Sequence, residues 1–189
     1  AVVPYFISQI YYVQKRFDEL LAYAPPLINA EENVKNNYPN ANEEIAHLIG
    51  DAYFIQEKYK EATYNFSVAL TKDPKNPEIY FARAFSRGSM EEYSGAISDL
   101  TKAIRLDSTN ADYYFYRGYF KSKLGNDKGA IRDFSKSIIR YPYYAETYYN
   151  RGINLMHLGL IEDACLDFKT AIELGDTLSL KYRASLCKE

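Results

Sequence analysis

The residue types that most often carry out catalysis are few in this sequence and far apart. His47 and His157 are distant from each other, and neither is next to a cysteine or in a metal-binding spacing such as His-Glu-x-x-His. Glycine-rich phosphate loops and a Gly-x-Ser-x-Gly elbow are absent, and we interpret the pairs Glu31-Glu32 and Glu91-Glu92 as solvated helix residues. The sequence therefore predicts a protein that is not an enzyme and has no cofactor and no metal site.

Cys165 and Cys187 are the only thiols of the chain. Two cysteines are too few for a disulfide-rich scaffold, and the Cys/His set of a structural zinc site is missing. By themselves they leave the compartment open.

Composition narrows the classes of partner. The 189 residues are 47% hydrophobic, enough to build a buried core in one domain or two small ones. A net charge of -2 gives no general attraction to nucleic acid or to anionic membranes. No apolar stretch is long enough to span a bilayer, and a targeting segment ahead of Ala1 would not be visible. We expect neither a nucleic-acid partner nor a membrane span, and the oligomeric state stays open.

Several sets of residues recur at steps of 34, and each set is called a column below. The columns are Gly50, Ala84, Gly118 and Gly152; Tyr80, Tyr114 and Tyr148; Ala62, Ala96, Ala130 and Ala164; Phe66, Leu100, Phe134 and Phe168; and Ala69, Ala103, Ser137 and Ala171. Agreement of columns of different residue type on one period indicates a repeat architecture.

Each repeat is predicted to be a helical hairpin. In one unit, two helix-period segments flank the turn signal Gly125-Asn126-Asp127. Gly118 and Ala130 permit close approach of the two helices, and Phe134 with Tyr114 fills the remaining space.

The ends of the repeats carry stop signals. Asp73-Pro74 and Tyr141-Pro142 close two units, because proline cannot continue a helix. Ser108 and Asp176 stand at the other two closures, and both residue types are good caps for a following helix.

This pattern resembles the tetratricopeptide repeat, whose signature has an aromatic residue, a small residue, then Ala, an aromatic, Ala and Pro at these offsets. The resemblance implies an all-α fold, a right-handed superhelical solenoid of about five helix-turn-helix repeats in a single domain, 1–189. The regular repeats are 43–76, 77–110, 111–144 and 145–178. Residues 1–42 are expected to form a divergent first repeat that Pro25-Pro26 interrupts. Residues 179–189 are expected to form a capping helix with an apolar stripe of Leu180, Ala184 and Cys187.

In this family, peptide ligands usually lie along the first helices of successive hairpins. The expected groove residues are Phe81, Phe85, Phe115, Tyr116, Tyr119, Tyr149, Asn150 and Ile153. Contiguous exposed aromatic residues favour a binding groove, although the same rings could fill gaps between neighbouring helices.

One subfamily, the co-chaperones, clamps a C-terminal carboxylate with Lys, Asn and Arg on these helices. Here His47, Phe81, Phe115 and Tyr149 stand at the positions of the Lys. Binding of that kind is therefore disfavoured. Carboxylates in the first turn of each first helix could attract a basic ligand, but they also complement the helix dipole wherever they occur. They are Glu44, Glu78, Asp112 and Glu146.

One further charge pattern follows the 34-residue period, and another lies within a single helix. Arg83, Arg117 and Arg151 are each followed sixteen residues later by Asp99, Asp133 and Asp167. Partly buried arginines need fixed carboxylate partners, so these residues are predicted to pair within the chain. Lys128, Arg132, Lys136 and Arg140 are four residues apart and form a basic stripe along one helix. The stripe is either a solvated surface or a contact for an anionic partner or lipid head group.

The repeat architecture also bears on whether the two cysteines lie close together. A cap helix that folds back onto the last repeat would carry Cys187 toward Cys165. The two residues are either a disulfide, in an oxidising compartment, or two buried free thiols. A weak likeness to bacterial, partly envelope-associated tetratricopeptide proteins leaves the cytoplasm and a bacterial periplasm or envelope as the candidate compartments.

The function expected from these features is a protein-interaction scaffold that binds a peptide or protein segment through an aromatic concave groove. A structural assembly subunit that uses its terminal repeats is the alternative. A carbohydrate-binding module is a third, because tyrosine-rich faces can also stack on sugars.

Overall fold

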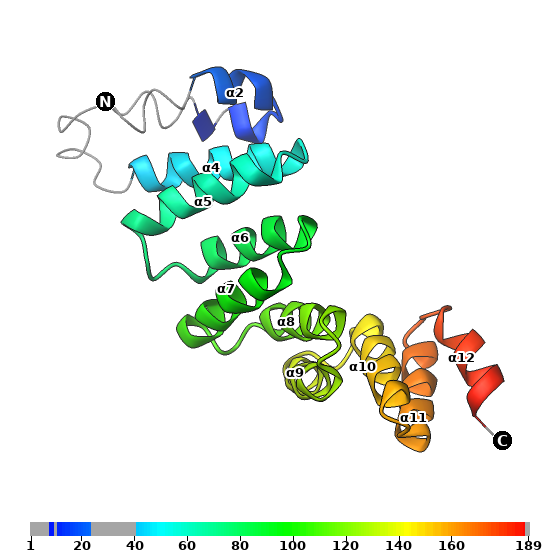
Figure 1. The fold of residues 1–189 in the computed structure, drawn as a ribbon. Helices are drawn as coiled ribbons and strands as arrows, with labels where there is room; N and C mark the ends of the chain where they lie inside the picture. Colours follow the sequence, from blue (N-terminus) through cyan, green and yellow to red (C-terminus); the bar gives the residue numbers. More distant parts are fainter. Residues whose placement is uncertain (1–7, 10, 24–40, 188–189) are drawn as a thin grey trace. The chain divides into compact units, whose positions relative to one another are not determined.

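The structure is a computed structural model that describes residues 8, 9, 11–23 and 41–187. For residues 41–44 it describes the backbone alone. Secondary structure in this part of the chain is helical throughout, which confirms the all-α prediction. The helices shown in Figure 1 are α2 (Phe17–Tyr23), α4 (Ala41–Ile55), α5 (Tyr59–Lys72), α6 (Pro77–Ser89), α7 (Tyr93–Leu106), α8 (Ala111–Lys123), α9 (Asp127–Arg140), α10 (Ala145–His157), α11 (Ile161–Glu173) and α12 (Ser179–Leu186).

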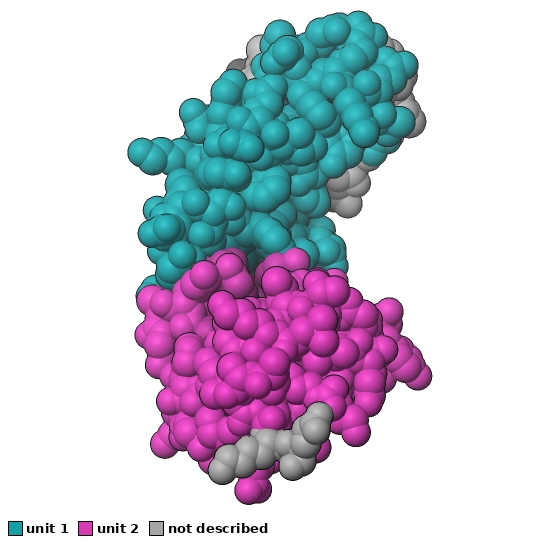
Figure 2. Space-filling model, turned by 90° about the vertical axis from the view of Figure 1, so that its right-hand side faces the viewer, with its two compact units in different colours: residues 1–95 teal, residues 96–189 magenta. Residues whose placement is uncertain are grey.

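The chain forms two compact units, residues 1–95 and 96–189 (Figure 2). In the first unit α4 and α5 form a hairpin, and α6 packs against α5. Phe66 on α5 is 1% exposed and lies against Gly50 on α4. A second small core joins α2 to α4 through Leu20, Ile45 and Ile49. Pro25-Pro26 and Glu31-Glu32 lie outside the described residues.

In the second unit, α8 with α9 and α10 with α11 form two further hairpins. Phe134 and Phe168 are each fully buried in the second helix of their hairpin. Each ring lies against a glycine of the first helix, so that a Cβ added at Gly118 or Gly152 would be 3.0 or 2.8 Å from the ring. The small residues thus permit the close helix approach that their spacing predicted.

The turns inside the hairpins use one recurring backbone conformation. Glu57, Glu91, Gly125 and Gly159 stand 34 residues apart, and all four have positive φ, between 59° and 74°. Glu91 is therefore a turn residue between α6 and α7, where the sequence analysis expected a helix. Its side chain is exposed, as expected.

Asparagines cap three of the helices. The side chains of Asn76, Asn110 and Asn126 accept hydrogen bonds from the backbone N–H groups of Glu78, Asp112 and Gly129. Ser108, which was expected to cap the helix after it, is exposed and lies two residues before the actual cap. Asp176 does act near the start of α12, where its Oδ2 accepts from Ser179 N at 2.7 Å.

The helix α12 packs on α11 in the place expected of a cap, but with a different face. Leu180 is 51% exposed and Ala184 is exposed, so the predicted stripe is wrong. Tyr182 and Leu186 pack against the core of the last hairpin instead. The ring of Tyr182 stacks on Phe168 with 5.2 Å between centroids, a contact that leucine and alanine side chains on the predicted face could not make.

Candidate ligand-binding surfaces

Two of the predicted groove residues lie on α6 in the first unit. Phe81 and Phe85 are half-buried, and their rings meet edge to face at 4.9 Å. Phe54 at the end of α4 adds a third ring, 6.5 Å from Phe85. These three residues are called the phenylalanine cluster. Sequence reasoning missed Phe54, because its column continues as Gly88, Ser122 and Met156 and therefore shows no aromatic ladder.

Phe115 on α8 is a core residue of its hairpin. Its side chain is 1% exposed, and its ring lies 5.7 Å from Phe134 and 5.2 Å from Tyr144. Phe115, which was expected to line the groove, therefore offers almost no surface to a ligand. The ring of Phe115 fills a gap between helices, which was the predicted alternative to ligand binding.

Tyr116 and Tyr119 follow Phe115 on the same helix and keep part of their surface exposed. Tyr116 stands edge to face against Phe115 at 4.9 Å. Partial burial raises the pKa of Tyr116, and the carboxylates of Glu146 and Asp112 raise it further. Lys123 places its ammonium 5.2 Å from the Tyr119 ring centroid. The phenol of Tyr116 therefore stays a protonated hydrogen-bond donor at neutral pH.

On α10, which lies beside α8, Tyr149, Asn150 and Ile153 are also half-buried. The ring centroid of Tyr149 lies 6.0 Å from that of Tyr182 on α12. Burial raises the pKa of Tyr149, and a hydrogen bond with Tyr182 raises it further. Asn150 donates from Nδ2 to the backbone carbonyl of Glu146 at 2.8 Å. The five residues Tyr116, Tyr119, Tyr149, Asn150 and Ile153 are called the tyrosine face.

The predicted arginine–aspartate pairs form within the second unit. Arg117 donates from Nε and Nη2 to the two oxygens of Asp133 at 2.8 and 2.7 Å. Arg151 makes the same fork to Asp167 at 2.8 and 2.7 Å. Hydrogen bonds to Asp167 raise the pKa of Arg151. These arginines are held inside the chain and are not ligand residues.

Each arginine also reaches back to a hydroxyl sixteen residues earlier. Arg83 Nη1 donates to Ser67 Oγ at 3.0 Å, and Arg117 and Arg151 donate in the same way to Thr101 and Ser135. Sequence reasoning missed this hydroxyl column, although its members recur at steps of 34. The column ties each first helix to the second helix of the preceding hairpin.

The basic stripe divides in two. Lys128, Arg132 and Lys136 are exposed on α9. Arg140 is held by the chain itself, since it donates to the carbonyl of Ser108 at 2.6 Å and lies 4.0 Å from the centroid of the Tyr114 ring. The first three remain a surface that an anion could reach.

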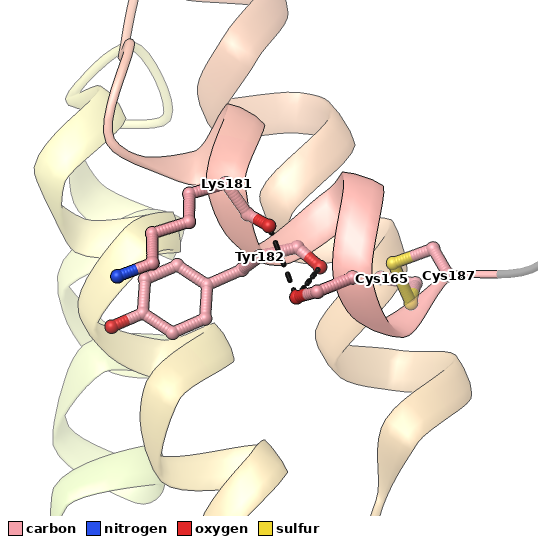
Figure 3. Close-up of a disulfide and its surroundings, with 5 residues drawn as sticks. Cys165, Lys181, Tyr182 and Cys187 are labelled. Atoms are coloured by element: carbon pink, nitrogen blue, oxygen red, sulfur yellow. Dashed lines mark hydrogen bonds between the residues drawn. A yellow bond between two sulfur atoms is a disulfide. The ribbon is translucent and has the colours of Figure 1, made fainter.

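The two cysteines form a disulfide between α11 and the end of α12 (Figure 3), with 5.7 Å between the Cα atoms. Of the two states that the sequence left open, the structure has the bonded one.

The two histidines each lie near one carboxylate. His47 is 3.7 Å from Asp51 on α4, and His157 is 3.1 Å from Asp127. In the described part of the chain, no three His, Cys, Asp or Glu side chains are grouped to hold a metal ion. Of the helices searched there, none is long and apolar enough to cross a membrane.

Comparison with known proteins gives the repeat and the fold. A family model described as TPR repeat matches residues 50–90. No curated protein matches the sequence. Similar solved structures include a crystal structure of MamA, with a TM-score of 0.78 and 23% identity over 94% of this chain and 96% of that one.

A second is YrrB, described as a TPR protein with an unusual peptide-binding site, with a TM-score of 0.82 and 19% identity over 98% and 92% of the two chains. A third is MamA from Desulfovibrio magneticus RS-1, with a TM-score of 0.78 and 17% identity over 91% and 93%. The family match confirms the predicted tetratricopeptide repeat at residues 50–90, and the similar structures share the fold over more than nine tenths of the chain.

Proposed function

We propose that the chain is an interaction scaffold without chemistry of its own, and that it binds a peptide or protein segment on the tyrosine face. The observation that carries the proposal is the layered arrangement of aromatic rings on α8. Phe115 is 1% exposed, whereas Tyr116 and Tyr119 above it stay partly exposed. A buried ring that fixes exposed rings makes a rigid platform, which loses little entropy when a ligand binds.

The chemistry of the tyrosine face suits an apolar segment with a polar backbone. The rings of Tyr116 and Tyr149 offer apolar surface with a hydroxyl at the edge. Asn150 donates to the chain from Nδ2, so its side-chain oxygen can accept from a ligand N–H. The described peptide-binding site of YrrB, a similar fold, supports a peptide as the ligand class.

The test uses the whole chain and a displayed library of random peptides. Peptides selected on the wild type are measured against the variant Tyr116→Ala/Tyr119→Ala and against the matched control Tyr141→Ala/Tyr143→Ala. Tyr141 and Tyr143 are 53% and 71% exposed and lie outside the tyrosine face. We expect the first variant to weaken binding by about 2 kcal/mol or more, and the control to bind like the wild type.

Equal affinity of all three proteins, with the helical circular dichroism retained, would place the peptide site elsewhere. Failure to select any peptide, together with binding on a glycan array, would favour the carbohydrate alternative.

Structural assembly remains a second candidate, because the cap carries exposed leucines. Leu178 and Leu180 are 62% and 51% exposed at the start of α12. A subunit that buries them would account for this apolar surface. In that case sedimentation should show an assembly that Leu178→Ser/Leu180→Ser disrupts, while peptide binding to the tyrosine face is unchanged.

A further inference from the structure

A pocket of about 290 Å³ lies between α9, α10 and α11 in the second unit, and shares no residue with the tyrosine face. Its apolar lining comes from Ile131, Leu155 and Leu166, one from each helix. Its charged lining comes from Arg151, Asp163 and Asp167. Binding in this pocket is therefore independent of peptide binding on the tyrosine face.

The charges of the pocket do not cancel. Arg151 and Asp167 neutralise each other through their two hydrogen bonds. Asp163 is exposed and adds a second carboxylate, to which no described side chain donates. An anion entering the pocket would meet two carboxylates. A cation with an aliphatic stem would instead find opposite charge and apolar walls.

The preceding hairpin shows which cation fits this geometry. There the corresponding carboxylate, Asp133, keeps its fork from Arg117 and also accepts from Lys121 Nζ at 2.7 Å through Oδ2. The same oxygen thus takes an arginine N–H and a lysine ammonium together. Lys121 reaches it from the position 34 residues before Leu155.

The last hairpin differs from the preceding one at three positions that line the pocket, Leu155, Asp163 and Leu166, and Leu166 stands in the place of Arg132. Leu155 replaces the lysine, so Asp167 Oδ2 accepts only from Arg151 Nε among the described residues. Asp163 stands where the preceding hairpin has Gly129. The internal ammonium is lost, and a carboxylate is gained at the same pocket.

We propose that this pocket receives a lysine side chain from a partner protein. The stem lies between Ile131, Leu155 and Leu166, and the ammonium contacts Asp163 and Asp167 Oδ2. We expect a lysine of a polypeptide rather than a free diamine. In the preceding hairpin the ammonium on Asp133 belongs to Lys121, whose backbone is held next to the carboxylate.

The probe is N-acetyl-lysine methylamide, added to the whole chain while the methyl signals of Ile131, Leu155 and Leu166 are followed by NMR. We expect saturable shifts with a Kd in the millimolar range, as suits one side chain. The norleucine analogue, which has the stem without the charge, should leave the signals in place. Cadaverine is the free-diamine arm.

Three variants give the controls. Asp163→Asn should weaken binding about fivefold or more, and the matched change Glu162→Gln, at an exposed carboxylate outside the pocket, should leave it unchanged. Leu155→Lys copies the preceding hairpin and should abolish binding, because its own ammonium takes the place on Asp167.

The proposal is overturned if blocked lysine shifts none of the three methyl signals, or if the norleucine analogue shifts them equally. It is also overturned if cadaverine binds and blocked lysine does not. Asp163→Asn removes one exposed charge, so it keeps the test decisive even if Leu155→Lys does not fold.

Discussion

At the scale of the residue, three glycines pack closely against phenylalanine rings, and Gly152 is one of them. A Cβ at Gly152 would come within 2.8 Å of Phe168 Cε1, and Phe168 is itself stacked on Tyr182. We expect Gly152→Ala to lower the free energy of unfolding by about 1–3 kcal/mol, because the ring has no free direction in which to move. Urea unfolding followed by circular dichroism measures this loss.

Gly95→Ala is the matched control. A Cβ at Gly95 would meet Arg87 Cδ at 3.1 Å, which is part of a flexible side chain. Alanine is the better helix former, so this variant should be more stable than the wild type by about 0.5–1 kcal/mol. Equal losses at both glycines would contradict the packing argument.

Asp51 on α4 makes stability depend on pH. Burial raises the pKa of Asp51 above its ordinary value, although His47 and a hydrogen bond from Tyr12 act in the opposite direction. Because the folded-state pKa lies above the unfolded one, the ionised form is disfavoured in the folded chain. Stability from this group is therefore greatest below the unfolded pKa of about 3.9 and is lost as the pH rises through the folded pKa.

Asp51→Asn removes this titration. The variant should match the wild type in stability at the acid end and should exceed it at neutral pH. The measurement is the difference in free energy of unfolding between the two proteins across the pH range, which cancels the other carboxylates. A difference that does not change with pH would refute the assignment to Asp51.

At the scale of the element, two turns of the recurring column have a glutamate with positive φ, Glu57 and Glu91. Glu91 has φ of 61°, a left-handed conformation that glycine adopts at Gly125 and Gly159 in the same column. Glu91→Gly should therefore stabilise the chain by up to about 1 kcal/mol, and Gly125→Glu should destabilise it by about 1 kcal/mol. Melting temperatures of the two reciprocal variants give the signs. Shifts in the same direction would show that the side chain matters more than φ.

The cap helix depends on its disulfide. The bond between Cys165 and Cys187 closes a loop across 22 residues, which is worth about 3 kcal/mol in the chain-entropy model. On reduction we expect faster amide hydrogen exchange in α12 and unchanged exchange in α8 and α9. Cys187→Ser should reproduce the reduced state. Protection of α12 that survives reduction would mean that Tyr182 and Leu186 suffice to hold the cap.

For the helix α12, the sequence predicted one feature correctly and another wrongly. The presence of a cap could be predicted, because the last repeat needs a covered face. Its inward face could not, since α12 is eight residues long and offers two apolar stripes. The face with Tyr182 packs inward because its ring stacks on Phe168, and this contact cannot be read from the sequence spacing.

At the scale of the whole molecule, the 34-residue columns predicted the hairpins and the forks of Arg117 and Arg151, because the same local pattern recurs with the same partners. The burial of Phe115 was not predictable in this way. It depends on Tyr144, which has Asn76 and Asn110 in its column, so no aromatic ladder marked it in advance. Columns thus predict the contacts that the repeats share, and they miss contacts made by a residue type that stands in one repeat only.

The arginine contacts with the hydroxyl column are made at three successive hairpins but have no counterpart on α11. Ser67, Thr101 and Ser135 each accept from the arginine of the next hairpin. In the last hairpin the fourth place is Lys169, whose ammonium is 3.9 Å from Glu173. A hairpin appended in register would bring its arginine against this lysine, cation to cation. The last described hairpin thus lacks the hydroxyl through which each earlier hairpin holds the arginine of the next one.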